Sequence, residues 1–520
     1  MNRETDMIKH MTGPRKSLAA AAALALVFGA GGLAAAQDQA ATGQNAATAS
    51  SGDEDMFGTE QVTEAAPQAA SPEKSFIKYD QVRVGGQITS SLGGTAVWMD
   101  PWNKGLGTVD YYYVTPAVQT DLTITAKPAE DFGVNLDLRM TYPFTTSTTA
   151  LSSATLTSNV LSTTKASFSA PNIDVWAAYA KFSLDDSVFM SFGKQPLAWG
   201  VSKGFFQPAD DIFTTVAVDY TNLSAQREGP IAFKAMIPVP RTMTNFYFYM
   251  GLPPTSTATA VSGFTGLPSA SNTSVNFNFG DMRYAAKAEM NAGNTELALA
   301  GYYCYNDYPR GLFMATTGTG DFNFYGEAIV KYGSERYFLT QTGNPLDPFT
   351  TTQKKDLCFF TGTLGGYYMD SDNNVTIMAQ VLYNGEGQTG ISAQNVYNDY
   401  FFALANSQQL FDRIELDTWY AGLSFSKSKL FTDDLSVGAY ALVNLSDLSG
   451  FVVPNVTWKF SDYMNMMLSA TFTFGGPDTQ FVLFGPDFQH YNYSIATHSL
   501  LSGNPGAALS LTFTLGTGAF

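Results

Sequence analysis

Charge is scarce in this chain, and so are cysteine and histidine. Charged residues make up 14% of the 520 positions, against roughly 25% in ordinary soluble domains. The mean hydropathy is nevertheless only -0.05, so apolar residues have not simply replaced the missing charge. Two cysteines and three histidines give little material for a disulfide framework or a metal site. Apolar residues are instead averaged with Ser, Thr, Asn and Gly, which is the composition that a β-barrel with a wet lumen produces.

The chain also lacks long apolar runs after Ala36 and any surplus of positive charge. No later stretch approaches the roughly 18 apolar residues of a membrane-spanning helix, so the sequence excludes helical spans. The net charge of -17 excludes a nucleic-acid binder, which needs a basic field. Acidic external loops would account for the excess of carboxylates, and so would a cation-preferring pore.

The N-terminus has the layout of a secretory signal peptide. Four basic residues precede an alanine-rich run over 18–36, which closes on an A-x-A cleavage site. We therefore predict a signal peptide over residues 1–36, cleaved after Ala36. A retained membrane anchor is the alternative, because the run is long enough to span, although alanine and glycine make it weakly hydrophobic. The candidate start residues are Met1, Met7 and Met11.

Residues 37–75 form a polar segment of Ala, Gln, Thr and Ser with an acidic stretch at Asp53, Glu54 and Asp55. It has too few large apolar groups to offset the entropy cost of ordering the chain. We predict a disordered, low-complexity leader in the periplasm. A small lumen-inserting segment is the alternative; the segment is too short and polar for the large folded plug of an active-transport receptor.

From residue 76 to 520 the sequence consists of short alternating segments separated by turn-rich stretches. The clearest lies at 131–140, where apolar residues alternate with polar or small ones, and a period of two over that length predicts a strand. Its apolar positions are Phe132, Val134, Leu136, Leu138 and Met140. Seventeen such segments can be read, including 294–305 and 320–333. The fold class is therefore all-β, a transmembrane antiparallel β-barrel.

The count of strands follows from parity. A bacterial barrel with both termini in the periplasm needs an even number, and long external loops alternate with short periplasmic turns as far as 320–333. With 306–319 taken as an external loop, a long stretch then stands where a short turn is due. A strand at Arg336–Thr342 restores the alternation. We therefore predict about 18 strands, with 16 as the nearest alternative.

The C-terminal stretch 508–520 alternates Leu509, Leu511, Phe513 and Leu515 with hydroxylated residues and ends on an aromatic residue. It resembles the final strand of Gram-negative outer-membrane β-barrels. The resemblance implies localisation in the outer membrane, contact with its lipid, and insertion by the barrel-assembly machinery through this strand.

A second resemblance begins within the segment at 187–195. Gly193-Lys194-Gln195 is followed by Trp199-Gly200, then by Pro208-Ala209-Asp210 and Arg227-Glu228-Gly229. This is similar to the G-[RK]-Q-x-x-x-W-G, P-x-D and R-x-G pattern of porin-like barrels related to the alginate-export proteins. The match covers about 45 of the 520 residues, and those relatives usually carry Arg where Lys194 stands. It implies an 18-stranded channel for small or extended polar solutes.

By similarity to general porins, the third external loop, 196–228, is expected to fold inward and form the constriction. The residues assigned to the constriction or to loop anchoring are Lys194, Gln195, Trp199, Lys203, Asp210, Asp211, Arg227 and Glu228. The inward charges of the lumen wall are Asp137, Arg139, Arg283, Lys287 and Glu289. A field between an acidic loop and a basic wall would orient dipolar solutes and set ion preference. Alternatively, Lys194 and Arg227 only anchor the loop to Asp210 or Asp211, and Trp199 belongs to the aromatic girdle.

These observations predict a porin for passive diffusion of small polar solutes or ions, with a mild cation preference from Asp210 and Asp211. The Thr/Ser-rich loops Thr145–Ala170 and Thr255–Ser274 leave open a surface adhesin or structural barrel with a closed lumen. A plugged receptor would need an inserted N-terminal segment. The solute and the oligomeric state stay open.

Catalysis has little support in the sequence. His490 and His498, the two histidines of the mature chain, belong to no recognisable motif. We predict no enzyme activity, no cofactor and no metal. Cys304 and Cys358 should lie on the ninth and twelfth strands, roughly 14 Å apart at about 4.8 Å per strand, beyond the reach of a disulfide.

Overall fold

The computed structural model describes residues 77–79, 82–107, 109–147, 165–168, 172–185, 187–213, 228–252, 279–334, 336–344, 347–390, 415–486 and 504–516. The predicted signal peptide and leader, the two histidines and the last four residues lie outside these ranges. So do residues 214–227 of the third loop, including Arg227.

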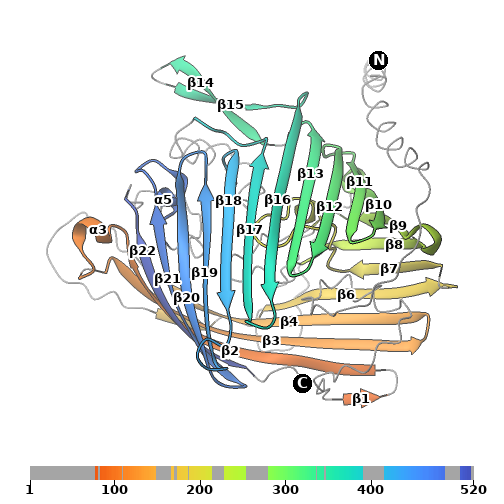
Figure 1. Cartoon of the computed structure of the whole chain (residues 1–520), viewed down its shortest axis with the longest axis horizontal. Coiled ribbons are helices and arrows are strands. Elements are labelled where there is room, and N and C mark those ends of the chain that lie inside the picture. The colour runs from red at the N-terminus through yellow and green to blue at the C-terminus, as the bar shows by residue number, and fades with distance from the viewer. Residues whose placement is uncertain are drawn as a thin grey trace, which may run out of the picture.

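Eighteen strands form a closed antiparallel barrel (Figure 1). Each pairs with the next in chain order, and β22 closes the barrel on β2 through pairs such as Val97↔Ala508. The expected fold class and strand number are confirmed. The barrel strands are β2 (Val82–Trp98), β3 (Tyr111–Ala129), β4 (Phe132–Ser147), β6 (Asn172–Leu184), β7 (Val188–Lys194), β8 (Ile231–Val239), β9 (Thr244–Gly251), β10 (Arg283–Ala292), β11 (Thr295–Cys304), β12 (Arg310–Thr319), β13 (Phe322–Tyr332), β16 (Cys358–Asp370), β17 (Val375–Asn384), β18 (Trp419–Lys427), β19 (Leu435–Asn444), β20 (Ser449–Ser461), β21 (Met464–Phe474) and β22 (Ala507–Gly516).

The remaining elements are short. β1 (Ile77–Tyr79) pairs with β2, and β5 (Lys165–Phe168) pairs antiparallel with the end of β4. Two helices, α3 (Pro101–Lys104) and α5 (Gln480–Phe484), lie in the first and last long loops. Among the described residues, no helix has the length and apolar character needed to cross a membrane.

Alternation explains why these segments form the wall. Along β22, the apolar side chains of Leu509, Leu511 and Phe513 point outward and are exposed, whereas Ser510 and Thr512 point inward. Large exposed apolar residues recur on the outer face of most strands. A barrel that exposes a continuous apolar surface is built for contact with lipid hydrocarbon.

The placement of one predicted strand is wrong. The region 306–319, expected to be a loop, contains barrel strand β12. Its inward residues Leu312 and Met314 are apolar and buried, so the run over 311–315 shows no polar alternation, and its connection to β11 is short. The expected strand at 336–342 instead belongs to β14 (Tyr337–Asn344), which pairs with β15 (Asp347–Gln353) in a hairpin separate from the barrel wall (Figure 1).

The two cysteines are unpaired, as predicted. Cys304 ends β11, the ninth barrel strand, and Cys358 begins β16, the twelfth. The number of strands between them is therefore correct, although one of those strands was assigned to the wrong segment.

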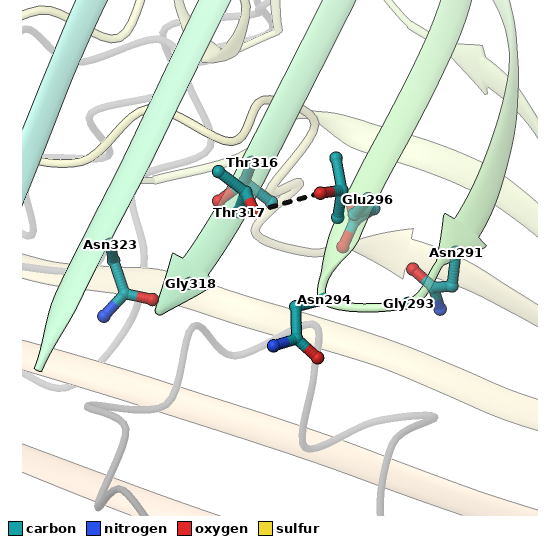
Figure 2. Close-up of a pocket in the computed structure, with 9 residues that line it drawn as sticks. Asn291, Gly293, Asn294, Glu296, Thr316, Thr317, Gly318 and Asn323 are labelled. Carbon is teal, nitrogen blue, oxygen red and sulfur yellow. Dashed lines mark hydrogen bonds between the residues drawn. The ribbon is translucent and has the colours of Figure 1, made fainter. Parts of the chain in front are cut away.

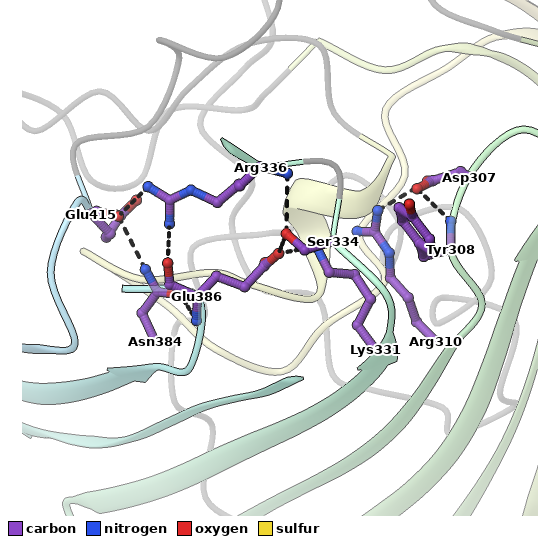
Figure 3. A network of polar contacts seen from close by, with 9 residues as sticks. All are labelled: Asp307, Tyr308, Arg310, Lys331, Ser334, Arg336, Asn384, Glu386 and Glu415. Atoms are coloured by element: carbon purple, nitrogen blue, oxygen red, sulfur yellow. Dashed lines mark hydrogen bonds and ion pairs between the residues drawn. The ribbon is translucent and has the colours of Figure 1, made fainter. Parts of the chain in front are cut away.

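A buried polar network ties together the long loops beside β13 and β17 (Figure 3). Lys331 Nζ and Glu386 Oε1 form an ion pair of 2.6 Å in which each side chain is only 8% exposed. Ser334 Oγ donates to the same carboxylate. Arg336 donates to the backbone oxygens of Glu386 and Glu415, at 3.2 and 3.3 Å. These contacts rigidify the long-loop end of the barrel on this side.

Candidate functional site

The loop that follows β7 enters the barrel interior. We call residues 195–213 the crossing loop. Its first residue, Gln195, is buried, donates from Nε2 to the oxygen of Ala232 at 2.8 Å, and accepts from Ser191 Oγ at 2.5 Å. Lys194 and Glu228 form an ion pair at its base. The loop therefore leaves the wall from a fixed point between β7 and β8.

Asp210 holds the crossing loop in a compact shape. Its Oδ1 atom accepts the backbone N–H groups of Trp199 and Gly200, each at 2.7 Å. A charged acceptor forms stronger hydrogen bonds than a neutral one. The two ends of the loop are thereby joined across about ten residues.

Glu327 on β13 attaches the crossing loop to the wall. Its Oε1 accepts from the backbone N–H groups of Val201 and Ser202, both at 2.7 Å, and its Oε2 accepts from Ala209 N–H at 3.1 Å. The side chain is only 4% exposed. Buried backbone donors need acceptors, and one carboxylate here satisfies three of them.

The tip of the loop reaches the far wall. Gln380 on β17 accepts from the N–H of Phe206 at 3.1 Å and donates to its oxygen at 2.5 Å, as a neighbouring strand would. The ring of Phe206 lies 6.3 Å from that of Tyr420. Phe205 packs over Gly422 on β18, where an added Cβ would collide with the ring.

These contacts place the base and the tip of the crossing loop on opposite sides of the barrel. In the closed order of strands, β18 is the ninth strand from β7 in either direction. Tyr325 supports the middle of the loop by donating from its hydroxyl to the oxygen of Lys203 at 2.8 Å. Gly204 adopts φ +84, a conformation in which a side chain would be strained. The loop therefore spans the interior from wall to wall.

The crossing loop divides the inner surface into two parts with eight strands each. We call the inner face of β8–β13, β16 and β17 the filled half, and that of β19–β22, β2–β4 and β6 the accessible half. In the filled half, Trp199 is fully buried and packs edge-on against Phe213 and Tyr249, with ring centroids 5.2 and 4.8 Å away. The wall residues in this apolar cluster include Ala285, Ala298, Ala300, Leu312, Met314 and Ile329.

The inward charged residues of β10 make their contacts within the filled half. Arg283 donates to the oxygen of Ile212 at 3.0 Å. Lys287 donates to the oxygen of Trp199 at 3.4 Å and forms an ion pair of 3.0 Å with Glu289. Two of these three residues therefore bind the backbone of the loop rather than facing it across open space.

At its short-turn end the filled half has a polar pocket of about 250 Å³ (Figure 2). Its lining is made of amides, hydroxyls and one carboxylate, from β10 to β13 and the turn between β10 and β11. The lining side chains are Asn291, Asn294, Thr295, Glu296, Thr316, Thr317 and Asn323. Apolar packing in the filled half is thus confined to the part nearer the long-loop end.

Inward residues nearer the short-turn end of the accessible half reach solvent, whereas Phe451 near its long-loop end is buried against Phe481 of α5. Gln87 and Thr123 are exposed, and Thr512 and Thr514 are partly exposed, although all four face the interior. An inward side chain can be exposed only where the interior is hollow. Hydroxyl and amide groups therefore line a solvent-accessible surface on this side of the crossing loop.

Two of the predicted wall residues, Asp137 and Arg139, lie in the accessible half. Arg139 Nε forms an ion pair with Asp121 Oδ1 at 2.9 Å, and its guanidinium carbon lies 3.8 Å from the centroid of the Trp176 ring. Asp137 Oδ1 is buried without a hydrogen-bond partner among the described residues. Asp137 and Arg139 are thus separated from the three charges of β10 by the crossing loop.

Several expectations for loop residues need correction. Lys194 pairs with Glu228, not with Asp210 or Asp211. Trp199 lies in the interior rather than in an aromatic girdle. Lys203 is exposed and Asp211 is half-buried, whereas Arg227 lies outside the described residues.

Two of the wall residues that hold the loop, Glu327 and Gln380, were not among the predicted site residues. Their signal was present, because the alternation of exposed Phe322, Phe324 and Val330 places Glu327 on the inner face of β13. The same alternation puts Asp137 and Arg139 on one face of β4, opposite Phe132 and Val134.

No family model matches this sequence, and neither does any curated protein. Among solved structures, OccAB1 of Acinetobacter baumannii is 10% identical, with a TM-score of 0.44 over 87% of this chain and 99% of that one. A BenF-like porin from Pseudomonas fluorescens Pf-5 is 9% identical, with a TM-score of 0.43 over 83% and 98%. Salmonella typhi OmpF, in complex with daunomycin, is 8% identical, with a TM-score of 0.37 over 84% and 99%. At such low values we assign neither family nor function from these likenesses; the fold stands on the strand pairing, and the likeness to alginate-export proteins stays a prediction.

Proposed function

We propose that this protein is an outer-membrane channel for passive diffusion of small polar solutes, with the third external loop (196–228) forming its constriction. The observation that carries the proposal is the contrast inside the barrel. A loop spans the interior and packs against one half of the wall, while inward hydroxyl and amide side chains on the other half remain open to solvent. A polar path through a lipid-exposed barrel is what diffusion of polar solutes requires.

The expected route runs beside the crossing loop, along the accessible half. Exposed Lys203 and half-buried Asp211 are the loop charges that we expect passing ions to meet. The long-loop end would face outward and the short-turn end the periplasm. The signal peptide 1–36 and the insertion of strand 508–520 by the barrel-assembly machinery belong to the same proposal.

Single-channel recording in planar bilayers tests the proposal directly. The purified barrel should produce discrete, ohmic conductance steps, and proteoliposomes should swell in isotonic solutions of small sugars and organic acids. A barrel that inserts but conducts no ions would contradict the proposal and favour a closed structural or adhesive barrel.

Deletion of residues 37–75 separates an open channel from a plugged one. An open channel should keep its conductance after the deletion, because the accessible surface is bounded by the crossing loop and the wall. A plugged receptor should open instead. Correct insertion of the shortened chain is checked by its heat-modifiable migration in gels.

A further inference from the structure

Three side chains of the accessible half, those of Gln87, Gln119 and Arg139, converge on the carboxylate of Asp121. Gln87, Asp121 and Arg139 stand opposite one another on β2, β3 and β4. Gln119 lies two residues before Asp121 on β3 and therefore faces the same side. The group stands well inside the barrel, since β3 extends from Tyr111 to Ala129.

Asp121 fixes the orientation of its three neighbours. It accepts from Gln119 Nε2 at 2.8 and 3.1 Å, from Gln87 Nε2 at 3.1 Å and from Arg139 Nε at 2.9 Å. The Trp176 ring packs against the guanidinium group of Arg139, whose carbon lies 3.8 Å from the ring centroid. The polar atoms of this group are therefore held in place before any solute arrives, which lowers the entropy cost of binding.

The atoms that remain unused form an alternating set of donors and acceptors. Arg139 is 31% exposed, and neither of its terminal amino groups bonds to a described residue. The amide oxygens of Gln87 and Gln119 likewise accept no hydrogen bond from the described part of the chain. A hydroxyl group can accept from the guanidinium and donate to an amide oxygen at the same time.

We propose that Arg139, Gln87 and Gln119 form a binding site for a neutral, polyhydroxylated solute such as a monosaccharide. This inference rests on the proposed channel function and names its solute class. The charge of Arg139 is neutralised by Asp121, and two further carboxylates lie nearby, since Asp137 is two residues away and Asp174 stands opposite Arg139 on β6. Anionic solutes are therefore disfavoured at a guanidinium that would otherwise attract them.

Glucose titration of single channels is the direct test, with gluconate as a singly charged anion of similar size. Added glucose should reduce the current or increase its noise in a saturable manner, and gluconate should bind more weakly. In Arg139→Gln, we expect the affinity for glucose to fall about tenfold, the factor expected for the loss of hydrogen bonds to a charged group. Gln87→Leu removes one acceptor and should lower the affinity less, about threefold.

Lys181→Gln is the matched control. It removes one positive charge from β6 on the same inner surface but touches none of the four residues, so glucose affinity should not change. Ion conductance without saturable glucose binding would overturn this inference and leave the channel function intact, whereas a lack of ion conductance would overturn the channel function itself. Tighter binding of gluconate than glucose would show that simple charge attraction acts here and would overturn the inference. Equal losses of glucose affinity in Arg139→Gln and Lys181→Gln would also overturn it, because binding would then not depend on the group around Asp121.

Discussion

The inner faces of β11 and β22 have the same backbone geometry and opposite surroundings. On β11 the inward residues Ala298 and Tyr302 are buried beneath the crossing loop. On β22 the inward residues Ser510 and Thr512 are polar and partly exposed. Strand alternation decides which side chains point inward, but the segments that enter the interior, above all the crossing loop, decide whether an inward side chain is packed or exposed to solvent.

The same contrast separates structural charges from those that can meet a solute. The charged groups of Glu327 and Arg283 form hydrogen bonds with backbone groups of the crossing loop. Arg139, in the accessible half, keeps two amino groups unbonded to described residues. A charge on the inner wall therefore has no fixed role until the position of the loop is known.

Replacing Glu327 should have the largest effect on the filled half. In Glu327→Ala the N–H groups of Val201, Ser202 and Ala209 lose their acceptor, and each unpaired buried donor costs about 1–3 kcal/mol. We expect the free energy of unfolding in urea to fall by roughly 3–5 kcal/mol. Single-channel conductance should rise, because the loop would leave the wall.

Asp137→Ala is the matched control in the accessible half. This inner carboxylate has one oxygen without a partner among the described residues, so its removal should change the free energy of unfolding by less than about 1 kcal/mol. Equal losses in the two variants would contradict the division of the interior into unlike halves.

Thiol reactivity should distinguish the halves nearly as strongly. Cys304 is buried in the filled half, and a thiol introduced as Thr512→Cys would face the accessible half. With exposed Cys358 changed to Ser, a charged methanethiosulfonate should modify position 512 roughly a hundredfold faster than Cys304, because the latter requires local opening. Mass spectrometry measures both rates, and comparable rates would mean that the filled half is not packed.

The parts of the fold that could be predicted from the sequence follow the same division. Alternation identified β22 and β4, whose outer and inner faces differ in polarity. It failed at β12, because Leu312 and Met314 face the apolar cluster, so both faces of that strand are apolar. Parity then gave the correct number of strands with one of them misplaced.

The candidate site was predictable only in part. The motif around Trp199 falls in the loop that enters the interior, and period-two counting put Asp137 and Arg139 on the same face of β4. The partners of the loop could not be derived, since Glu327 and Gln380 lie more than 100 residues away in sequence. Such contacts depend on closure of the whole barrel rather than on any local pattern.

Substitution of Gly422 should have a moderate effect on the far attachment of the loop. In Gly422→Ala the new Cβ would collide with the Phe205 ring, and overpacking of this kind typically costs about 1–3 kcal/mol. We expect a lower free energy of unfolding and a noisier open channel. Gly94→Ala is the control, because nothing lies within 4 Å of its added Cβ; similar losses in both variants would place the effect in strand propensity instead.

The smallest expected effect concerns ion selectivity. One carboxylate oxygen of Asp210 accepts hydrogen bonds from the backbone N–H groups of Trp199 and Gly200. We therefore expect Asp210→Asn to change the structure of the loop more than the ion selectivity of the pore. Asp211 is half-buried and Lys203 is exposed on the same loop, and a single charge acts over about one Debye length, roughly 10 Å at 0.1 M salt.

Under a KCl gradient we expect the wild-type channel to prefer cations mildly and Asp211→Asn to move the reversal potential slightly toward anion preference. Lys203→Gln should move it by a similar amount in the opposite direction. Unchanged reversal potentials in both variants would remove the crossing loop from the ion path and leave selectivity to the wall around Asp121 and Arg139.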